Sequence, residues 1–206
     1  MSVKKLKTPT YNSPGKLAIR DQIFAYIQKN IENPLLLDFY GAGQSFEAAN
    51  KLGINTISID NGLKHVDRSA LHEILNGPNL IYTELRDLCQ HPIALEGKKF
   101  NAMWLDYCGK YCQGVRDDIH SLQTIMQNKG VIYFTLYKGR EPFEKGTDRR
   151  LINGGIVLDM QEMFAQVGIK TTLIFQRDYM GGAEYDGRKK NGGTPMIVHG
   201  FTWEKI

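Results

Sequence analysis

Two apolar runs in the first third of the chain each end in residue types that suit a nucleoside-like ligand. The run 35–40 leads into a Gly-x-Gly turn, and the run 55–60 ends in a carboxylate. Glycine lets a backbone approach a ligand closely and adopt positive φ, and a carboxylate can accept hydrogen bonds from ribose hydroxyls. The residues expected to contact the ligand here are Asp38, Tyr40, Gly41, Ala42, Gly43, Asp60 and Asn61.

A later apolar run, 100–107, ends in a second group of residues that could take part in chemistry. Asp106 and Tyr107 close this run, and Cys108 follows. A carboxylate can accept hydrogen bonds from an amine, and an aromatic ring can stack on a flat base. Asp106 and Tyr107 are therefore the candidate catalytic residues. Two alternatives remain open: Cys108 attacks a pyrimidine as a nucleophile, or Asp106 only caps the helix that begins near Gly114.

Two segments rich in Gly, Lys and Arg, 138–156 and 180–193, resist assignment to a helix or strand. Long irregular segments in a compact domain are often functional, and Lys or Arg beside aromatic residues suits single-stranded nucleic acid. A solvated loop of mixed charge is the alternative. The candidate substrate-binding residues are Lys138, Arg140, Arg188, Lys189 and Lys190.

All these residues need a scaffold, and the sequence predicts one in which strands and helices alternate. The predicted strands are 35–40, 55–60, 79–85, 100–107, 131–137, 169–179 and 194–206. The predicted helices are 16–31, 45–53, 66–77, 114–130 and 159–168. Such alternation favours a three-layer α/β fold, with helices on both faces of a mostly parallel sheet. Ligands bind at the carboxyl edge of such sheets, which is where the candidate residues lie.

The turn after Asp38, together with Asp60, resembles motifs I and II of class I, Rossmann-like, S-adenosylmethionine-dependent methyltransferases. The resemblance covers roughly residues 33–206. It implies a seven-stranded sheet whose last strand runs antiparallel between the fifth and sixth, and it implies S-adenosylmethionine as cofactor. It also implies that Glu84 or Asp87, after the third strand, binds the adenine amine. A solvated carboxylate at a helix start is the alternative for either residue.

The first loop departs from the family's acidic-x-Gly-x-Gly-x-Gly pattern. Tyr40, Ala42 and Gln44 stand at the glycine positions when Asp38 is the anchor. A shift of one residue gives a form similar to the Asp-x-Phe-x-Gly-x-Gly of DNA methyltransferases. A dinucleotide is the competing cofactor, but its Gly-x-Gly-x-x-Gly pattern needs a glycine where Phe46 stands.

Length and composition fit one globular domain. The chain has 206 residues, of which 42% are hydrophobic and 23% charged, and its net charge is +4. We expect an N-terminal arm over 1–15 and a methyltransferase-like domain over 16–206. No apolar run is long enough for a membrane span, and the mild positive charge permits nucleic acid as a partner. Three sparse cysteines indicate a reducing, cytoplasmic setting without a structural metal.

These features predict an S-adenosylmethionine-dependent methyltransferase that acts on nucleic acid, at a base amine of RNA or DNA. The methyl donor is already activated, so transfer depends on placement and desolvation more than on acid–base catalysis. A catalytic triad is therefore not expected. A small-molecule or protein acceptor is one alternative. A catalytically silent member that binds the cofactor or a partner is the other, and the oligomeric state is left open.

Overall fold

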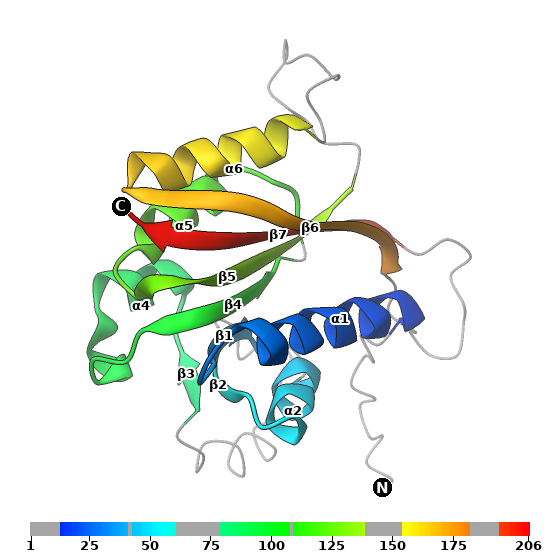
Figure 1. The fold of residues 1–206 in the computed structure, drawn as a ribbon, viewed down its shortest axis with the longest axis horizontal. Coiled ribbons are helices and arrows are strands. Elements are labelled where there is room, and N and C mark those ends of the chain that lie inside the picture. The colour runs from blue at the N-terminus through cyan, green and yellow to red at the C-terminus, as the bar shows by residue number, and fades with distance from the viewer. Residues whose placement is uncertain (1–12, 41–42, 61–78, 108, 139–153, 182–193) are drawn as a thin grey trace, which may run out of the picture.

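The computed structural model describes residues 13–40, 43–60, 79–107, 109–138, 154–181 and 194–206. Helices and strands alternate along most of the described chain (Figure 1). The first elements are α1 (Pro14–Asn30), β1 (Leu35–Phe39), α2 (Gln44–Lys51), β2 (Asn55–Asp60), β3 (Leu80–Tyr82), α4 (Leu85–Gln90) and the 3-10 turn η1 (Pro92–Leu95). They are followed by β4 (Phe100–Asp106), α5 (Gln113–Leu122), β5 (Met126–Tyr137), α6 (Gly154–Gln166), β6 (Ile169–Gly181) and β7 (Thr194–Lys205).

The strands form one seven-stranded sheet in the order β3-β2-β1-β4-β5-β7-β6. The pairs from β3 through β5 are parallel, whereas β7 runs antiparallel to both of its neighbours, β5 and β6. The predicted α/β fold, with an antiparallel last strand inserted beside the fifth, is confirmed. Parallel pairing places the carboxyl ends of β1 to β4 at one edge of the sheet.

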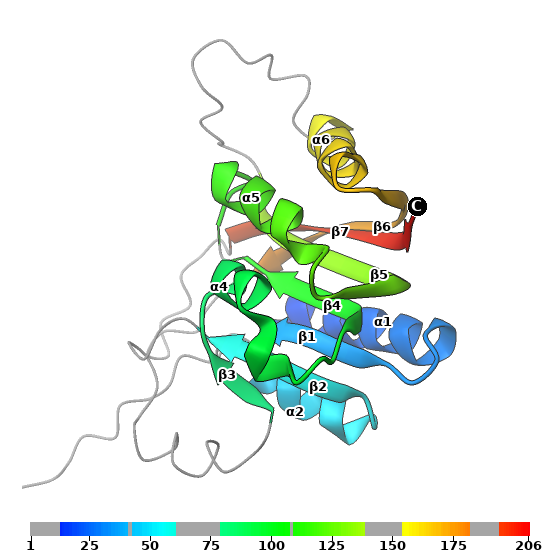
Figure 2. The same ribbon diagram turned by 90° about the vertical axis from the view of Figure 1, so that its left-hand side faces the viewer.

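Helices cover both faces of the sheet, so the molecule has three layers (Figure 2). Alternate residues of a strand point to opposite faces, and the two hydrophobic cores follow this rule. One core lies under α4, α5 and α6 and takes Leu37 from β1 and Leu105 from β4. The other lies under α1 and α2 and takes Leu36 and Trp104 from the same strands. Neighbouring residues at a strand end therefore face different helical layers.

Helix α1 begins at Pro14, two residues before the predicted start. Ser13 is its N-cap, and its hydroxyl accepts a hydrogen bond from the Lys16 backbone N–H at 3.2 Å. A proline at the first helical position has a φ angle that suits the helix, and the N–H that it lacks would have no partner within the helix. Pro14 and Gly15, expected in the N-terminal arm, therefore belong to α1, and Lys16 lies in its first turn.

Two predicted elements were wrong in part. The predicted strand 79–85 ends at Tyr82, because α4 begins at Leu85. The predicted helix 114–130 ends at Leu122, and residues 126–130 open strand β5 instead. Gly130 lies in that strand rather than at a helix end. A side chain there would come within 2.2 Å of the Asn101 carbonyl and 2.4 Å of the Trp203 ring.

The predicted helix 66–77 lies outside the described residues, as does most of 138–156 and 180–193. Helix α6 begins at Gly154, five residues before the predicted start. Among the described helices, none combines the length and apolar character that a membrane crossing requires.

Candidate functional site

A cavity of about 640 Å³ opens at the carboxyl edge of the sheet, on the face covered by α4 and α5. Residues at or just after the ends of four parallel strands contribute to its wall, and the start of α5 completes it. The lining residues are Phe39, Ile59, Asp60, Thr83, Glu84, Leu85, Arg86, Tyr107, Gly109, Lys110, Cys112, Gly114, Val115 and Asp118.

Aromatic rings form one wall of this cavity. Phe39, at the end of β1, and Tyr107, just after β4, meet edge to face with ring centroids 5.1 Å apart. The Tyr107 hydroxyl donates to Asp118 Oδ2 of α5 at 2.7 Å, and burial raises the tyrosine pKa well above its ordinary value. The hydroxyl is thus held by α5, while the ring lines the cavity.

Three predicted cofactor carboxylates have different positions relative to the cavity. Asp60, at the end of β2, is partly buried and lines it. Glu84 also lines it, as the exposed N-cap residue of α4. Asp87 is exposed in the first turn of α4 and is not among the lining residues. The structure therefore brings Asp60 and Glu84 together at the cavity and leaves Asp87 outside it.

Arg86 also lines the cavity, and sequence reasoning did not identify it. Its guanidinium Nη2 lies 3.3 Å from Asp118 and 3.5 Å from Asp117, and it donates to the Gly114 carbonyl at 3.4 Å. Arg86 therefore ties α4 to the start of α5. No sequence motif around Arg86 identifies it as a site residue.

On the opposite face of the same strand ends, Asp38 is 1% exposed. Its carboxylate accepts hydrogen bonds from Ser58 of β2 and Ser45 of α2. Burial raises its pKa to about 6, against these hydrogen bonds, and the nearby Asp106 adds to the rise. Its Oδ2 atom has no hydrogen-bond partner within the described chain. Asp38 therefore joins β1 to β2 and α2, and it does not line the cavity.

The first loop turns at Gly43, the N-cap residue of α2, with φ +75°. A Cβ atom on Gly43 would come within 2.6 Å of the Tyr40 hydroxyl. Tyr40 packs against Phe46, with ring centroids 6.1 Å apart, and burial raises its pKa. The glycine is thus needed for its left-handed backbone and for the Tyr40 side chain that lies over it.

Asp106, the candidate catalytic carboxylate, forms an ion pair with Lys16 Nζ from the first turn of α1. The two side chains are only 16% and 24% exposed. One helical turn further along α1, the Arg20 Nη1 donates to the Gln44 carbonyl at 3.3 Å. Lys16 was expected at the boundary of a terminal arm, so sequence reasoning missed its contact with the end of β4.

Lys138, predicted to bind substrate, forms an ion pair with Asp178 of β6. Its backbone N–H donates to the Pro195 carbonyl at 2.8 Å. The predicted site residues Gly41, Ala42, Asn61, Arg140, Arg188, Lys189 and Lys190, and the alternative nucleophile Cys108, lie outside the described residues. No cluster of His, Cys, Asp and Glu suited to a metal ion occurs among the residues that are described.

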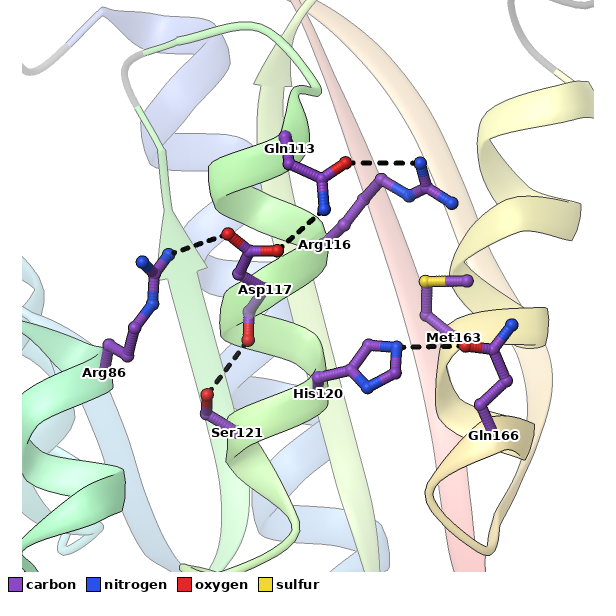
Figure 3. Close-up of a pocket in the computed structure, with 8 residues that line it drawn as sticks. All are labelled: Arg86, Gln113, Arg116, Asp117, His120, Ser121, Met163 and Gln166. Carbon is purple, nitrogen blue, oxygen red and sulfur yellow. Dashed lines mark hydrogen bonds and ion pairs between the residues drawn. The ribbon is translucent and has the colours of Figure 1, made fainter.

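A second cavity of about 560 Å³ is lined by residues of α4, α5 and α6 (Figure 3). Arg86 of α4 borders both cavities. On α5, Arg116 lies 3.2 Å from Asp159 of α6, and His120 Nε2 is 3.1 Å from Gln166 Oε1. Both guanidinium groups already face carboxylates, so this groove offers no excess of positive charge.

Comparison with known proteins gives no match to a family model and none to a curated protein. Several solved structures do match. PH1948 from Pyrococcus horikoshii, a candidate RNA methyltransferase, is 13% identical with a TM-score of 0.60, and the match covers 100% of this chain and 92% of that one. The SAM-dependent methyltransferase from Agrobacterium tumefaciens is 13% identical with a TM-score of 0.57, over 95% and 63%. Trm5b from Pyrococcus abyssi is 15% identical with a TM-score of 0.57, over 94% and 50%.

The chain therefore spans about two thirds of the Agrobacterium enzyme and half of Trm5b. At these identities the likeness concerns the fold. The strand order and the antiparallel β7 agree with it. The chain has the Rossmann-like fold of class I S-adenosylmethionine-dependent methyltransferases.

Proposed function

We propose that this protein is an S-adenosylmethionine-dependent methyltransferase whose acceptor is a nucleic acid. The observation that carries the proposal is the cavity at the carboxyl ends of β1 to β4, with a carboxylate at the end of β2 and an aromatic wall between β1 and β4. Ligands of open parallel sheets bind at this edge.

The lining of the cavity fits the cofactor. Its volume of about 640 Å³ lies within the range of roughly 300–1,000 Å³ that is usual for small-molecule pockets. Phe39, Ile59 and Val115 offer apolar surface to a flat base, and Asp60 can accept hydrogen bonds from ribose hydroxyls. Glu84 can accept a hydrogen bond from an exocyclic amine.

The bound cofactor would supply a methyl group on a positively charged sulfur that acts as the leaving group. The protein's part is then to bind, orient and exclude water. Asp106 is the last residue of β4 and lies at the same edge of the sheet, on the face of α1 and outside the cavity lining. There its partly buried carboxylate can accept a hydrogen bond from an acceptor N–H or O–H. Tyr107, the next residue, lines the cavity, and its hydroxyl donates a hydrogen bond to Asp118.

Nucleic acid as the acceptor is supported by the charge and by one named likeness. The net charge is +4, and the basic residues Arg188, Lys189 and Lys190 follow β6 in the sequence. PH1948 is a candidate RNA methyltransferase by name. Lysine and arginine side chains that neutralise phosphates release condensed counterions, which makes binding depend on salt.

The test uses S-adenosylmethionine labelled with tritium in the methyl group, and random-sequence single-stranded RNA or DNA as acceptor. We expect label in the nucleic acid. If about five basic residues contact phosphates, log affinity for the single strand should fall against log salt with a slope of about −3 to −4. Lys189→Ala/Lys190→Ala should make that slope shallower by about 1 to 1.5.

Calorimetry with S-adenosylhomocysteine separates the remaining outcomes. Cofactor binding without transfer to nucleic acid, protein extract or small molecules would identify a catalytically silent member. Binding with transfer only to a small molecule or a protein would replace the acceptor class. Absence of cofactor binding by the folded protein would overturn the proposal as a whole.

A further inference from the structure

The ion pair between Lys16 and Asp106 joins two parts of the chain that are ninety residues apart. Asp106 ends β4 at the edge where the cavity opens, and Lys16 reaches it from α1. Both side chains are more than three-quarters shielded from water. A pair shielded to this degree is screened less by salt than an exposed one, so its charges interact more strongly.

Local energetics disfavour a lysine at this place in the helix. The N-terminal turn of a helix carries partial positive charge, and acidic residues are preferred there. The first turn of α1 holds no acidic residue but does hold Lys16. A residue that breaks the local rule often has its compensation elsewhere in the fold. Here the compensation is the Asp106 carboxylate.

The first turn of α1 is fixed in place by contacts with the end of β6. The Ser13 hydroxyl donates to the Met180 carbonyl at 3.0 Å. A Cβ on Gly15 would lie 3.2 Å from the Tyr179 side chain, so the backbone of α1 lies close against β6. One turn later, Arg20 contacts the start of α2. Lys16 therefore approaches β4 from a helical turn that is held against β6.

The negative charges of Asp106 and the nearby Asp38 are expected to be stabilised by a cation. Asp38 lies close enough to Asp106 for the negative charge of Asp106 to raise the Asp38 pKa. Asp38 receives hydrogen bonds from two hydroxyl groups, Ser58 and Ser45. Among the described contacts of this pair of carboxylates, the positive charge comes from Lys16.

We propose that Lys16 is a positioning residue of the methyl-transfer site, and that its ammonium group holds the Asp106 carboxylate in the orientation that receives the acceptor. The inference rests on the proposed function. It adds the first turn of α1 to the acceptor side of the site. Lys16 acts through Asp106, so its loss should impair the transfer step and leave cofactor binding intact.

The experiment compares Lys16→Met, Lys16→Arg, Asp106→Asn and the double variant Lys16→Met/Asp106→Asn with the wild type. Lys29→Met is the matched control, because Lys29 is exposed in the last turn of the same helix. Transfer is measured with labelled S-adenosylmethionine and random-sequence single-stranded RNA. Affinity for S-adenosylhomocysteine is measured by calorimetry, and folding by circular dichroism.

We expect Lys16→Met to lower kcat about 10- to 100-fold, the range for loss of a charged hydrogen bond. S-adenosylhomocysteine affinity should stay unchanged, and Lys16→Arg should recover most of the rate because it keeps the charge. The double variant should be no slower than Asp106→Asn, since the two residues act as a unit. Lys29→Met should match the wild type.

Three results would overturn the inference while leaving the proposed function intact. They are a wild-type kcat in Lys16→Met, an equal loss of cofactor affinity and rate in that variant, and additive losses in the double variant. If Lys16→Met does not fold, Lys16→Arg alone decides: a rate loss there as large as that of Asp106→Asn counts against the proposal. A wild-type protein that transfers no label instead removes the proposed function, and the inference with it.

Discussion

The two faces of the same strand ends differ in chemistry although their residues are neighbours in the chain. Phe39 and Tyr107 face α4 and α5, where their rings meet beside an open cavity. Asp38 and Asp106, each one residue earlier, face α1 and α2. Asp38 is buried and accepts a hydrogen bond from Ser58, whereas Asp106 is partly buried and pairs with Lys16. In each pair of adjacent residues, one side chain is an aromatic ring at the cavity and the other is a carboxylate on the opposite face.

This difference follows from the two-residue period of a strand. It gives the strand ends an open cavity on one face and carboxylates on the other. On the cavity face, side chains line an open volume of about 640 Å³. On the α1 face, Asp38 accepts a hydrogen bond from Ser58, and Asp106 pairs with Lys16. Substitutions on each face should therefore have different consequences for stability and for binding.

The largest effect is expected on the α1 face, from Asp38→Asn. The pKa of Asp38 is raised from 3.8 to about 6 by burial, so between these pH values the folded protein keeps a proton that the unfolded chain releases. Wild-type stability is therefore lost as pH rises through this window, by up to about 3 kcal/mol. The variant lacks this term. Its free energy of unfolding, relative to wild type, should rise between about pH 4 and pH 6 in urea titrations.

The buried His199 provides a control of opposite sign. Burial lowers its pKa from 6.5 to about 4, so the unfolded chain binds the extra proton and stability is lost as pH falls through that window. For His199→Phe, the free energy of unfolding relative to wild type should therefore fall as pH rises from about 4 to 6.5. A pH-independent difference for Asp38→Asn would contradict the assignment of Asp38.

The next effect tests the cavity face. Asp60→Ala should weaken S-adenosylhomocysteine binding by about 1.5–3 kcal/mol, which is the usual loss for hydrogen bonds to a charged group. Asp87→Ala is the control, because Asp87 is exposed near the same edge and does not line the cavity. Calorimetry should find its affinity close to that of the wild type. Equal losses in both variants, or none in either, would remove the cavity as the cofactor site.

A smaller effect concerns Gly43, in the loop between β1 and α2. Gly43 and Gly53 have nearly equal φ angles, +75° and +73°, but a Cβ would meet Tyr40 only at Gly43. Each alanine substitution carries the left-handed backbone cost of about 1–2 kcal/mol. Gly43→Ala should lose about 0.5–1.5 kcal/mol more in thermal unfolding, because Tyr40 must leave its rotamer. Identical losses at both positions would show that Tyr40 adapts freely.

The smallest effect is expected at Lys138. Its ion pair with Asp178 is partly exposed, at 35% and 50% for the two side chains, and such pairs contribute about 0–1 kcal/mol. Lys138→Met should therefore change the melting temperature little. If Lys138 also contacts phosphates, Asp178→Asn should strengthen RNA binding by freeing the lysine. Unchanged RNA affinity in both variants would take Lys138 out of the substrate surface.

The sequence by itself determined much of the scaffold. Period and turn residues located β1, β2 and β4 closely, because these strands are short apolar runs bounded by loops. The rule that ligands bind where parallel strands end then placed Asp60, Glu84 and Tyr107 at one edge. All three line the cavity. That step needed only the order of the elements.

Other features were decided by tertiary contacts. Residues 126–130 suit a helix by local pattern, but they pair as the start of β5, where Gly130 leaves room for Trp203. The partners of Arg86 and Lys16 depend on how α4 and α1 pack against the sheet, so the sequence did not predict these contacts. No local pattern specifies a partner ninety residues away. The sequence determines which side chains lie at the end of a strand, and the packing of the helices determines which groups those side chains contact.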